Sequence, residues 1–480
     1  MSRSTPHDAM PRGSRWRLLK RVTGAAVISP RRGAAMKSSR VALAAVLALV
    51  GMLSANPAPA RALPFNIVTE WNLIAVNTLV GLPGPAGGAP PSAQIHVGMV
   101  QGAVYDAVNA TEPKHYRPHL LDRRFSARAS QEAAVATAAY EVLKNIVSTV
   151  PNIADGARAA VLATLLSQYN ASVDPIPNSP FKTRGIEAGI AAADAMIAAR
   201  MNDGRFGDSQ WDSSTGVGRW QPLLNADGVP IQDPTPWVGG VQPFLIPSSS
   251  WFRTAGPLGL GSPEYAAEYN DVKEIGAINS LTRTTFETYA ARWWQSTPNA
   301  SWNEVARDLV ARNDFGLLDS ARLFAMQNLS AADAAINCWN DKYFWDFWRP
   351  VNAIRWSDPD GDGNAATEPD PLWTPLINAP YPDHPSGHLC LDGAHTQVLQ
   401  MFFGDVIAGG YQITSASTLL LLTDPRARTF DSFSEALAEL LDARVWAGLH
   451  FRTADVQGQS LGMNVADFAA ANYFQPVGNH

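Results

Sequence analysis

Along most of the chain, hydrophobic positions recur every three to four residues, which is the spacing of a helix that buries one face. The pattern predicts helices over residues 95–111, 130–149, 183–203, 263–276, 284–294, 302–313, 331–347, 389–403, 433–447 and 454–473. Stretches in which hydrophobic and polar residues alternate one by one, as in a half-buried strand, are scarce. The sequence therefore predicts an all-α protein made of packed helical bundles.

The N-terminal residues have the features of an export signal. Residues 1–40 are basic and irregular, residues 41–55 are apolar and uncharged, and residues 58–62 are rich in alanine. Such a succession is typical of a secretory signal peptide, so we expect residues 1–62 to be removed on export to the periplasm or the exterior. Within it, residues 1–35 are interpreted as a wrongly assigned extension, with Met36 as the true start. An uncleaved anchor, or a twin-arginine signal at Arg31-Arg32, fits the sequence less well.

We expect the mature chain to comprise an N-terminal helical region, residues 63–300, and a C-terminal bundle, residues 301–480. Residues 205–262 interrupt the helical pattern and are rich in glycine, proline and tryptophan. A long irregular segment of this kind is typical of a functional lid or a wrapping arm. A surface excursion held down by its own aromatic residues is an equal alternative.

A second irregular stretch, residues 358–370, begins like a calcium-binding loop, with Asp358, Asp360 and Asp362 in alternate positions. The twelfth position of such a loop supplies a bidentate glutamate, but here it is Pro369. A solvated acidic turn is therefore favoured over a calcium site.

The charge of the chain narrows the classes of partner. The net charge is −6, but residues 1–62 hold 11 basic residues and a single acidic one, so residues 63–480 carry a net charge of −16. The negative net charge of residues 63–480 argues against nucleic acid as a partner, because phosphate binding needs a basic surface. It also argues against docking on an anionic membrane. A hydrophobic content of 46% with 15 tryptophans predicts a large core, and no second apolar span follows the signal.

The first segment with candidate chemistry runs from Lys342 to Pro350. Lys342 and Arg349 are seven residues apart, about two helical turns, which predicts that both cations project from one helix face. Asp346, one turn from each, is placed to orient either cation. By itself the pattern is also typical of a salt-bridged helix surface.

The second segment is Pro385-Ser386-Gly387-His388, which precedes an apolar helical run. Proline and serine before such a run predict a helix start, whose free N–H groups and dipole favour an anion. Ser386 adds a hydroxyl donor, Gly387 lets an anion approach the backbone, and His388 is placed to move a proton at the edge of the site. An ordinary helix cap with an unrelated histidine is the alternative.

The third segment runs from Arg444 to His450. Six residues correspond to roughly 240° of helix rotation, so one continuous helix would not bring both side chains to one face. Gly448 offers a helix end between them, after which His450 can enter from the following turn. Together the three segments supply three cations, a hydroxyl, a glycine N–H and two histidines. This set suits a buried oxyanion such as phosphate or an analogue.

In this order, K-x6-R-P, P-S-G-H and R-x5-H, the three segments resemble the motifs of the vanadium-dependent haloperoxidases and the related type 2 phosphatidic acid phosphatase superfamily. The resemblance implies two packed four-helix bundles, with an oxyanion site at one end of the C-terminal bundle. It also implies vanadate as cofactor, with hydrogen peroxide, a halide and a small organic acceptor as reaction partners.

Residue roles follow from the same resemblance. His450 would be the vanadium ligand, and Lys342, Arg349, Ser386, Gly387 and Arg444 would hold the oxygens. His388 would act as acid and base, and Lys342 would polarise peroxide. Tyr381, five residues before Ser386, occupies a position that tunes halide preference in the family, and His384 is a second candidate for the halide site or an exposed loop residue.

The same residues would serve a secreted acid phosphatase in which His450 is the nucleophile. The phosphatase pattern places an aspartate four residues after this histidine, where the chain has Ala454 and then Asp455. This departure favours the haloperoxidase.

Two further classes of function stay open. One is a metal hydrolase that uses His384, His388, Asp392 or His395, although Pro385 disrupts the helical spacing of the first two. The other is a protein that binds an oxyanion without turnover. Finally, if the helices that carry Cys338 and Cys390 border one anion, a disulfide between these two cysteines is expected in an oxidising compartment.

Overall fold

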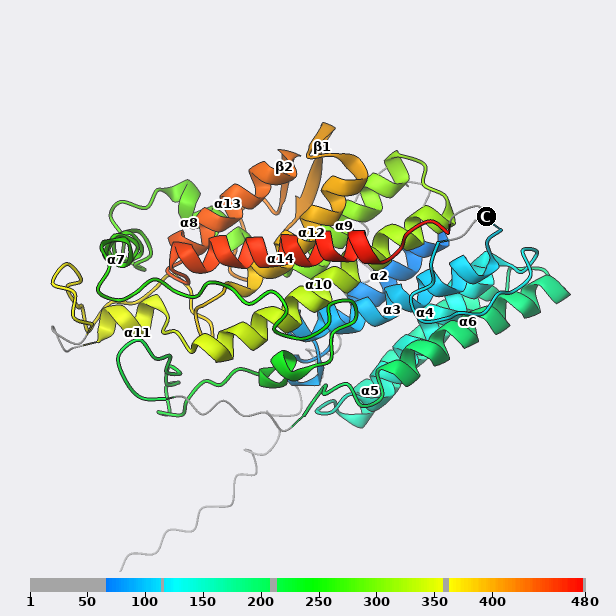
Figure 1. Cartoon of the computed structure of the whole chain (residues 1–480), viewed down its shortest axis with the longest axis horizontal. Coiled ribbons are helices and arrows are strands. Elements are labelled where there is room, and N and C mark those ends of the chain that lie inside the picture. Colours follow the sequence, from blue (N-terminus) through cyan, green and yellow to red (C-terminus); the bar gives the residue numbers. More distant parts are fainter. Residues whose placement is uncertain (1–65, 114–115, 208–213, 357–361, 478–480) are drawn as a thin grey trace, which may run out of the picture. The chain divides into compact units, whose positions relative to one another are not determined.

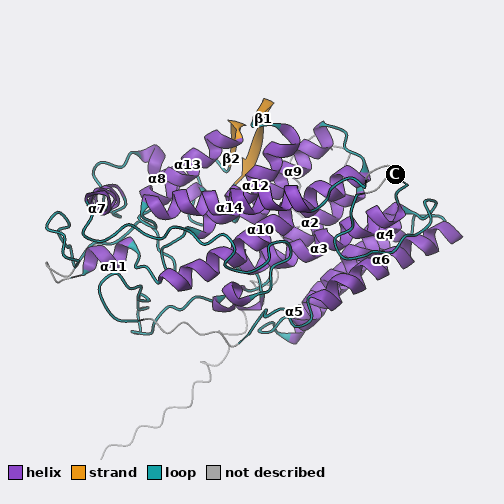
Figure 2. Ribbon diagram, viewed as in Figure 1, coloured by secondary structure: helices purple, strands orange, loops and turns teal. Residues whose placement is uncertain are grey.

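The computed structural model describes residues 66–113, 116–207, 214–356 and 362–477. Within these ranges it contains thirteen α-helices, two short 3-10 helices and one two-stranded sheet, so the predicted all-α class is confirmed (Figure 2). The described residues form one compact unit. The division of this unit at residue 300 stays a prediction.

Five helices precede the irregular segment: α2 Ile67–Val80, α3 Pro90–Thr111, α4 Gln131–Thr149, α5 Asp155–Val173 and α6 Pro180–Ala199 (Figure 1). Helices α3, α4 and α6 pack against one another, and α5 lies against α4. Glycines bring α6 close to α4, because a Cβ at Gly185 would lie 2.2 Å from the Ser130 carbonyl oxygen and one at Gly189 2.6 Å from that of Ala134. Any larger residue would force these helices apart.

The C-terminal half is built on α9 Pro298–Arg312, α10 Leu317–Trp345, α12 Gly387–Phe403, α13 Phe433–Trp446 and α14 Arg452–Asn472. The long helix α10 contacts α3, α12 and α14, so it links the two groups of helices (Figure 1). Helices α12 and α14 approach closely through glycines: a Cβ at Gly462 would lie 2.1 Å from the Cys390 carbonyl oxygen. This close packing fixes the start of α12, where the second motif lies.

The remaining elements are short. They are the 3-10 helices η1 Gly84–Ala86 and η2 Pro236–Gly240, the helices α7 Pro263–Ile275, α8 Thr285–Trp293 and α11 Pro350–Arg355, and the strands β1 Val406–Thr414 and β2 Ala427–Ser432. The strands pair antiparallel, with Tyr411 opposite Phe430 and a register shift towards Val406. The periodicity did not predict this hairpin.

Within its described residues, the irregular segment that follows α6 contains the short helix η2, and it lies along α10. Three polar residues one turn apart on α10, Asp333, Asn337 and Asp341, accept hydrogen bonds from backbone N–H groups of the segment. Asp333 alone accepts three, from residues 244–246, at 2.7–2.9 Å. Side-chain acceptors thus replace the ladder that this backbone lacks, and the segment is a wrapping arm.

Two predictions fall on residues outside the described ranges. The signal peptide lies in residues 1–65, and Asp358 and Asp360 of the acidic turn lie in residues 357–361. Asp362 is described and accepts hydrogen bonds from Asn364 N, at 2.9 Å, and from the Thr367 hydroxyl. Among the described helices, none is long and apolar enough to cross a bilayer.

Candidate functional site

The prediction that Lys342 and Arg349 project from one helix face was wrong. The chain changes direction between these two residues. Helix α10 ends at Trp345, and Asp346 follows in a left-handed conformation with φ of 49°. Arg349 then caps the N-terminus of the short helix α11. Asp346 orients neither cation: it accepts a hydrogen bond from Ser214 and lies 3.7 Å from Arg219. The turn at Asp346 therefore brings the two cations together.

The ammonium group of Lys342 is fully buried in the loop that leads to α12. It donates to the carbonyl oxygens of Pro382 at 2.9 Å and Asp383 at 3.1 Å, and to that of Pro385. Burial lowers the pKa of Lys342 to about 8, with the Arg349 guanidinium contributing in the same direction. An anion beside it would favour the charged form.

Helix α12 starts as predicted, at Gly387 with Ser386 as its N-cap residue. Ser386 makes no capping bond to its own helix, and its buried hydroxyl lies beside the Asp455 carboxyl group without forming a hydrogen bond of standard geometry. At Gly387 a Cβ would lie 3.0 Å from the ring of Trp339, so glycine lets Trp339 of α10 pack closely against the helix start. A serine hydroxyl and free helix N–H groups are suited to an oxyanion.

The two arginines are buried, with N–H groups directed at no protein acceptor. Arg349 donates from Nε to the Tyr381 carbonyl at 2.6 Å and from Nη1 to that of Leu449 at 2.7 Å. Its Nη2, and both Nε and Nη1 of Arg444, have no partner in the described part of the chain. Unpaired buried donors are costly, and a bound oxyanion would satisfy these. The residues therefore fit an anionic cofactor such as vanadate or phosphate.

His450 is held by a carboxylate that the sequence analysis did not single out. Its Nδ1 lies 2.8 Å from Asp383 Oδ1, and both side chains are 1% exposed. This contact leaves Nε2 as the nitrogen for a ligand. Burial lowers the pKa of His450, and Arg349, Lys342 and Arg444 act in the same direction, which places all three cations around this ring.

Asp455, the aspartate that the phosphatase pattern would pair with His450, makes no hydrogen bond to His450. Its buried oxygens make no well-formed hydrogen bond within the described residues. Burial raises the pKa of Asp455 to about 7, against the opposing effects of Ser386 and Arg444. Asp455 therefore lies on the Ser386 and Arg444 side of the site.

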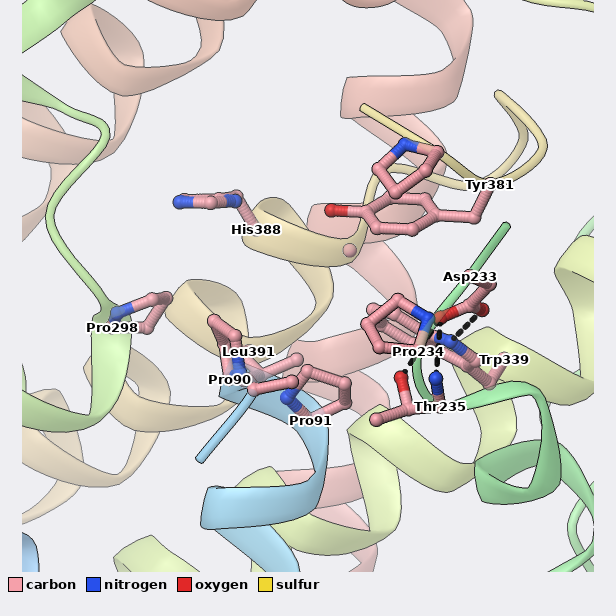
Figure 3. Close-up of a pocket in the computed structure, with 13 residues that line it drawn as sticks. Pro90, Pro91, Asp233, Pro234, Thr235, Pro298, Trp339, Tyr381, His388 and Leu391 are labelled. Atoms are coloured by element: carbon pink, nitrogen blue, oxygen red, sulfur yellow. Dashed lines mark hydrogen bonds between the residues drawn. The ribbon is translucent and has the colours of Figure 1, made fainter. Parts of the chain in front are cut away.

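His388 is the second residue of α12, and Figure 3 shows it at the edge of a cavity, with Tyr381 across from it. Burial lowers its pKa, with a further contribution from Arg444, so the ring is neutral without a ligand. Its Nε2 has no partner among the residues described. A neutral ring with a free nitrogen can accept and return a proton.

Tyr381 packs beneath the cations. Its ring centroid lies 5.1 Å from Lys342 Nζ and 5.0 Å from the guanidinium carbon of Arg349. Both distances are within the range of cation–π attraction, so the ring helps to place the cations.

His384 is buried, and the alternative of an exposed loop histidine was wrong. Its Nε2 lies 3.1 Å from the Thr254 hydroxyl of the wrapping arm. Burial lowers the pKa of His384 to about 3, helped by Lys342. The role of His384 in halide binding stays a prediction.

The expected disulfide is absent: Cys338 and Cys390 are both buried free thiols in the described structure. The helices do meet as predicted, and the two thiols lie within hydrogen-bonding reach of each other. Cys338 Sγ also points at the Pro385 carbonyl oxygen, at 3.8 Å. The thiols thus fill the space beside the site without bridging it.

The metal-hydrolase interpretation fails on geometry. Among the described residues, no three His, Cys, Asp or Glu side chains converge as metal ligands. His395 instead lies 3.0 Å from Gln94 Oε1, and Asp392 accepts a hydrogen bond from Trp302.

Known proteins share this sequence pattern and this fold. A family model described as the VCPO second helical-bundle domain matches residues 322–479. Vanadium chloroperoxidase of Curvularia inaequalis is 26% identical over 281 residues, 44% of this chain and 45% of that protein, so the match spans less than half of the relative.

Two solved structures have the same fold. The first bacterial vanadium-dependent iodoperoxidase aligns with a TM-score of 0.68 at 21% identity, over 86% of this chain and 98% of that chain. A holo-type bacterial vanadium-dependent chloroperoxidase aligns with a TM-score of 0.62 at 18% identity, over 82% and 93%. Residues 322–479 contain all three motifs. Over these residues the chain matches the family model, and the chain as a whole has the fold of these two vanadium-dependent haloperoxidases.

Proposed function

We propose that this protein is a vanadate-dependent haloperoxidase, which oxidises a halide with hydrogen peroxide to a hypohalous acid. The observation that carries the proposal is the convergence of three buried cations on His450: Lys342, Arg349 and Arg444 all lower the pKa of its ring, and Asp383 holds its Nδ1. The two arginines have N–H groups without a partner among the described residues. Such a site favours an oxyanion that also takes one nitrogen ligand, as vanadate does.

In this function the site residues would have separate roles in binding vanadate and in transferring a proton. Lys342, Arg349, Ser386, Gly387 and Arg444 would hold the oxygens of vanadate, and His450 Nε2 would bind the metal. When bound, vanadate supplies a Lewis acid that activates peroxide. The halide loses two electrons to the peroxide O–O bond, and one proton completes the products, hypohalous acid and water. His388, neutral and at the edge of the site, is placed to hold and deliver that proton.

A secreted acid phosphatase is the second candidate, and one observation favours it. The sequence argued against a phosphatase because the orienting aspartate is displaced to Asp455, but Asp383 supplies an equivalent contact to His450. An imidazole that is held in one orientation among cationic side chains can attack the phosphorus atom of a phosphate ester. The arrangement of these side chains is suited to either reaction.

One experiment separates the two candidates. The purified protein is incubated with peroxide and chloride, bromide or iodide in turn, with and without vanadate, and in parallel with p-nitrophenyl phosphate. We expect vanadate-dependent halide oxidation, and the three arms rank the halides. Release of p-nitrophenol that vanadate inhibits, without halide oxidation, would make the protein a phosphatase.

A further inference from the structure

A pocket of about 320 Å³ lies between the short helix α11 and the wrapping arm. Its lining residues come from residues 219–223 of the arm and from residues 351–356 of α11 and its C-cap. Helix α11 carries Arg349 of the oxyanion site at its N-cap, but Arg349 does not line the pocket. No other residue assigned to the oxyanion site lines it either, so the pocket is separate from that site.

Hydrogen bonds hold the arm in place beside α11. Trp220 N donates to the carbonyl oxygen of Asp346 at 3.0 Å, next to the turn that leads into α11. Asn352 of α11 donates from Nδ2 to the carbonyl oxygen of Gln221 at 2.9 Å, and both of these residues line the pocket. The two sides of the pocket are therefore joined directly, and its shape is largely formed before a ligand binds.

Two arginines make one part of the pocket positive. The side chain of Arg219 is 51% exposed, and its ion-pair partner Asp346 lies at 3.7 Å, which is too far for a hydrogen bond. Arg355 donates from Nε to the Trp373 carbonyl oxygen at 2.6 Å and from Nη2 to the Thr374 hydroxyl at 3.1 Å, and its Nη1 makes no hydrogen bond to the described residues. No described Asp or Glu lines the pocket. Both guanidinium groups can therefore bind an anion, and a planar carboxylate matches their geometry.

The other part of the pocket is apolar and aromatic. Leu223, Val351 and Trp356 line it, and the Trp356 ring packs at 6.1 Å from that of Trp348. The buried Nε1 of Trp356 has no acceptor among the described residues. A fixed indole ring offers a flat surface against which an aromatic ligand can stack. A cavity of about 150 Å³ with apolar walls is known to hold benzene, so this larger pocket has room for two fused rings.

We propose that this pocket, here named the α11 pocket, is a second anion site that binds an aromatic carboxylate. The carboxylate group would lie at Arg219 and Arg355, and the ring would lie against Trp356. A small inorganic anion would leave the apolar part of the pocket unfilled, and an uncharged aromatic molecule would leave the arginines without an anion. The proposal does not depend on the reaction that the oxyanion site catalyses.

The test is isothermal titration of 2-naphthoate into the full chain, with and without excess vanadate. Vanadate fills the oxyanion site, so binding that persists in its presence reports on another site. We expect saturable binding of one 2-naphthoate per chain, with the same affinity in both titrations. The uncharged 2-naphthamide has the same ring system, and it should bind about tenfold more weakly because it loses the charge-assisted hydrogen bonds.

Two variants locate the site. Arg219→Gln should weaken 2-naphthoate binding about tenfold and leave 2-naphthamide binding unchanged, because only the acid pairs with the guanidinium group. Arg184→Gln is the matched control, since Arg184 is an exposed arginine of α6 outside the pocket lining. Leu223→Trp fills the pocket without removing a charge and should weaken the binding of both ligands.

The retained affinity of Arg219→Gln for 2-naphthamide shows that this variant is folded, and Leu223→Trp tests the same pocket independently. Equal affinity of the wild type for the acid and the amide would overturn the proposal. So would unchanged 2-naphthoate binding in both pocket variants, displacement of 2-naphthoate by vanadate, or the absence of saturable binding to the wild type.

Discussion

Asp383 Oδ1 lies 2.8 Å from His450 Nδ1, although 67 residues separate the two along the chain. Asp383 precedes α12 and His450 follows α13, so the contact ties the second motif to the third. A carboxylate on one imidazole nitrogen fixes the ring orientation and directs the other nitrogen to a ligand. Asp383 is therefore a positioning residue that neither motif contains.

Asp383→Asn should weaken vanadate binding and halide oxidation by roughly 10- to 100-fold, because the amide keeps the shape but can turn an NH2 group instead of an acceptor oxygen towards His450 Nδ1. Vanadate titration and steady-state kinetics measure the two effects. Asp455→Asn is the control, since Asp455 does not hydrogen-bond His450, and it should be the milder change. A normal vanadate affinity in Asp383→Asn would contradict the assigned role.

Arg444→Met should abolish stabilisation by vanadate without destabilising the vanadate-free protein. The buried Arg444 Nε and Nη1 have no acceptor among the described residues, so its removal relieves a desolvation penalty of about 1–3 kcal/mol while a similar volume fills the site. Thermal unfolding with and without vanadate measures both effects. A large loss of stability in the vanadate-free variant, with the vanadate shift retained, would show that Arg444 is structural.

Oxyanion binding should weaken as pH rises through about 8, because burial lowers the pKa of Lys342 to about 8 and the neutral amine attracts an anion less. Lys342→Met should bind more weakly at pH 7 and lose this pH dependence. Comparing the variant with the wild type at each pH cancels the ionisation of the anion itself. Parallel pH profiles for the two proteins would contradict this account.

The stability of the vanadate-free protein should respond to Asp392, whose pKa is raised by burial to about 7. A carboxyl that holds its proton more tightly in the folded state stabilises the fold below pH about 4, and this contribution disappears as pH rises through about 7. Its full size is about 4 kcal/mol. The free energy of unfolding of Asp392→Asn, relative to wild type, should therefore increase between pH 4 and 7. A pH-independent difference would argue against a buried neutral carboxyl.

Helices with a strong apolar period were predicted well from the sequence. Helix α4 was predicted over residues 130–149 and observed over Gln131–Thr149. Helix α5 was not predicted, and the structure gives the reason: only Leu165 and Val173 of this helix are buried, so its apolar face is narrow. In α10 the prediction began at residue 331, whereas the helix begins at Leu317.

The parts of the candidate site that depend on local sequence could be predicted. The parts that depend on tertiary packing could not. The helix start at Gly387 and the break at Gly448, with φ of 72°, follow from glycine and capping preferences. The pairing of Asp383 with His450 depends on how the turn after α13 packs over the loop before α12, which no periodicity encodes. The left-handed conformation of Asp346 could not be predicted either, because aspartate also occurs inside helices.

We propose that the protein needs one vanadate, held at His450, to convert peroxide and halide to hypohalous acid. The most direct test titrates vanadate into the purified protein while bromide oxidation is followed in the same sample, for the wild type and for His450→Ala. We predict that wild-type activity rises to a plateau at one vanadate per chain and that His450→Ala stays inactive. Bromide oxidation that needs no vanadate, or that persists in His450→Ala, would contradict the account.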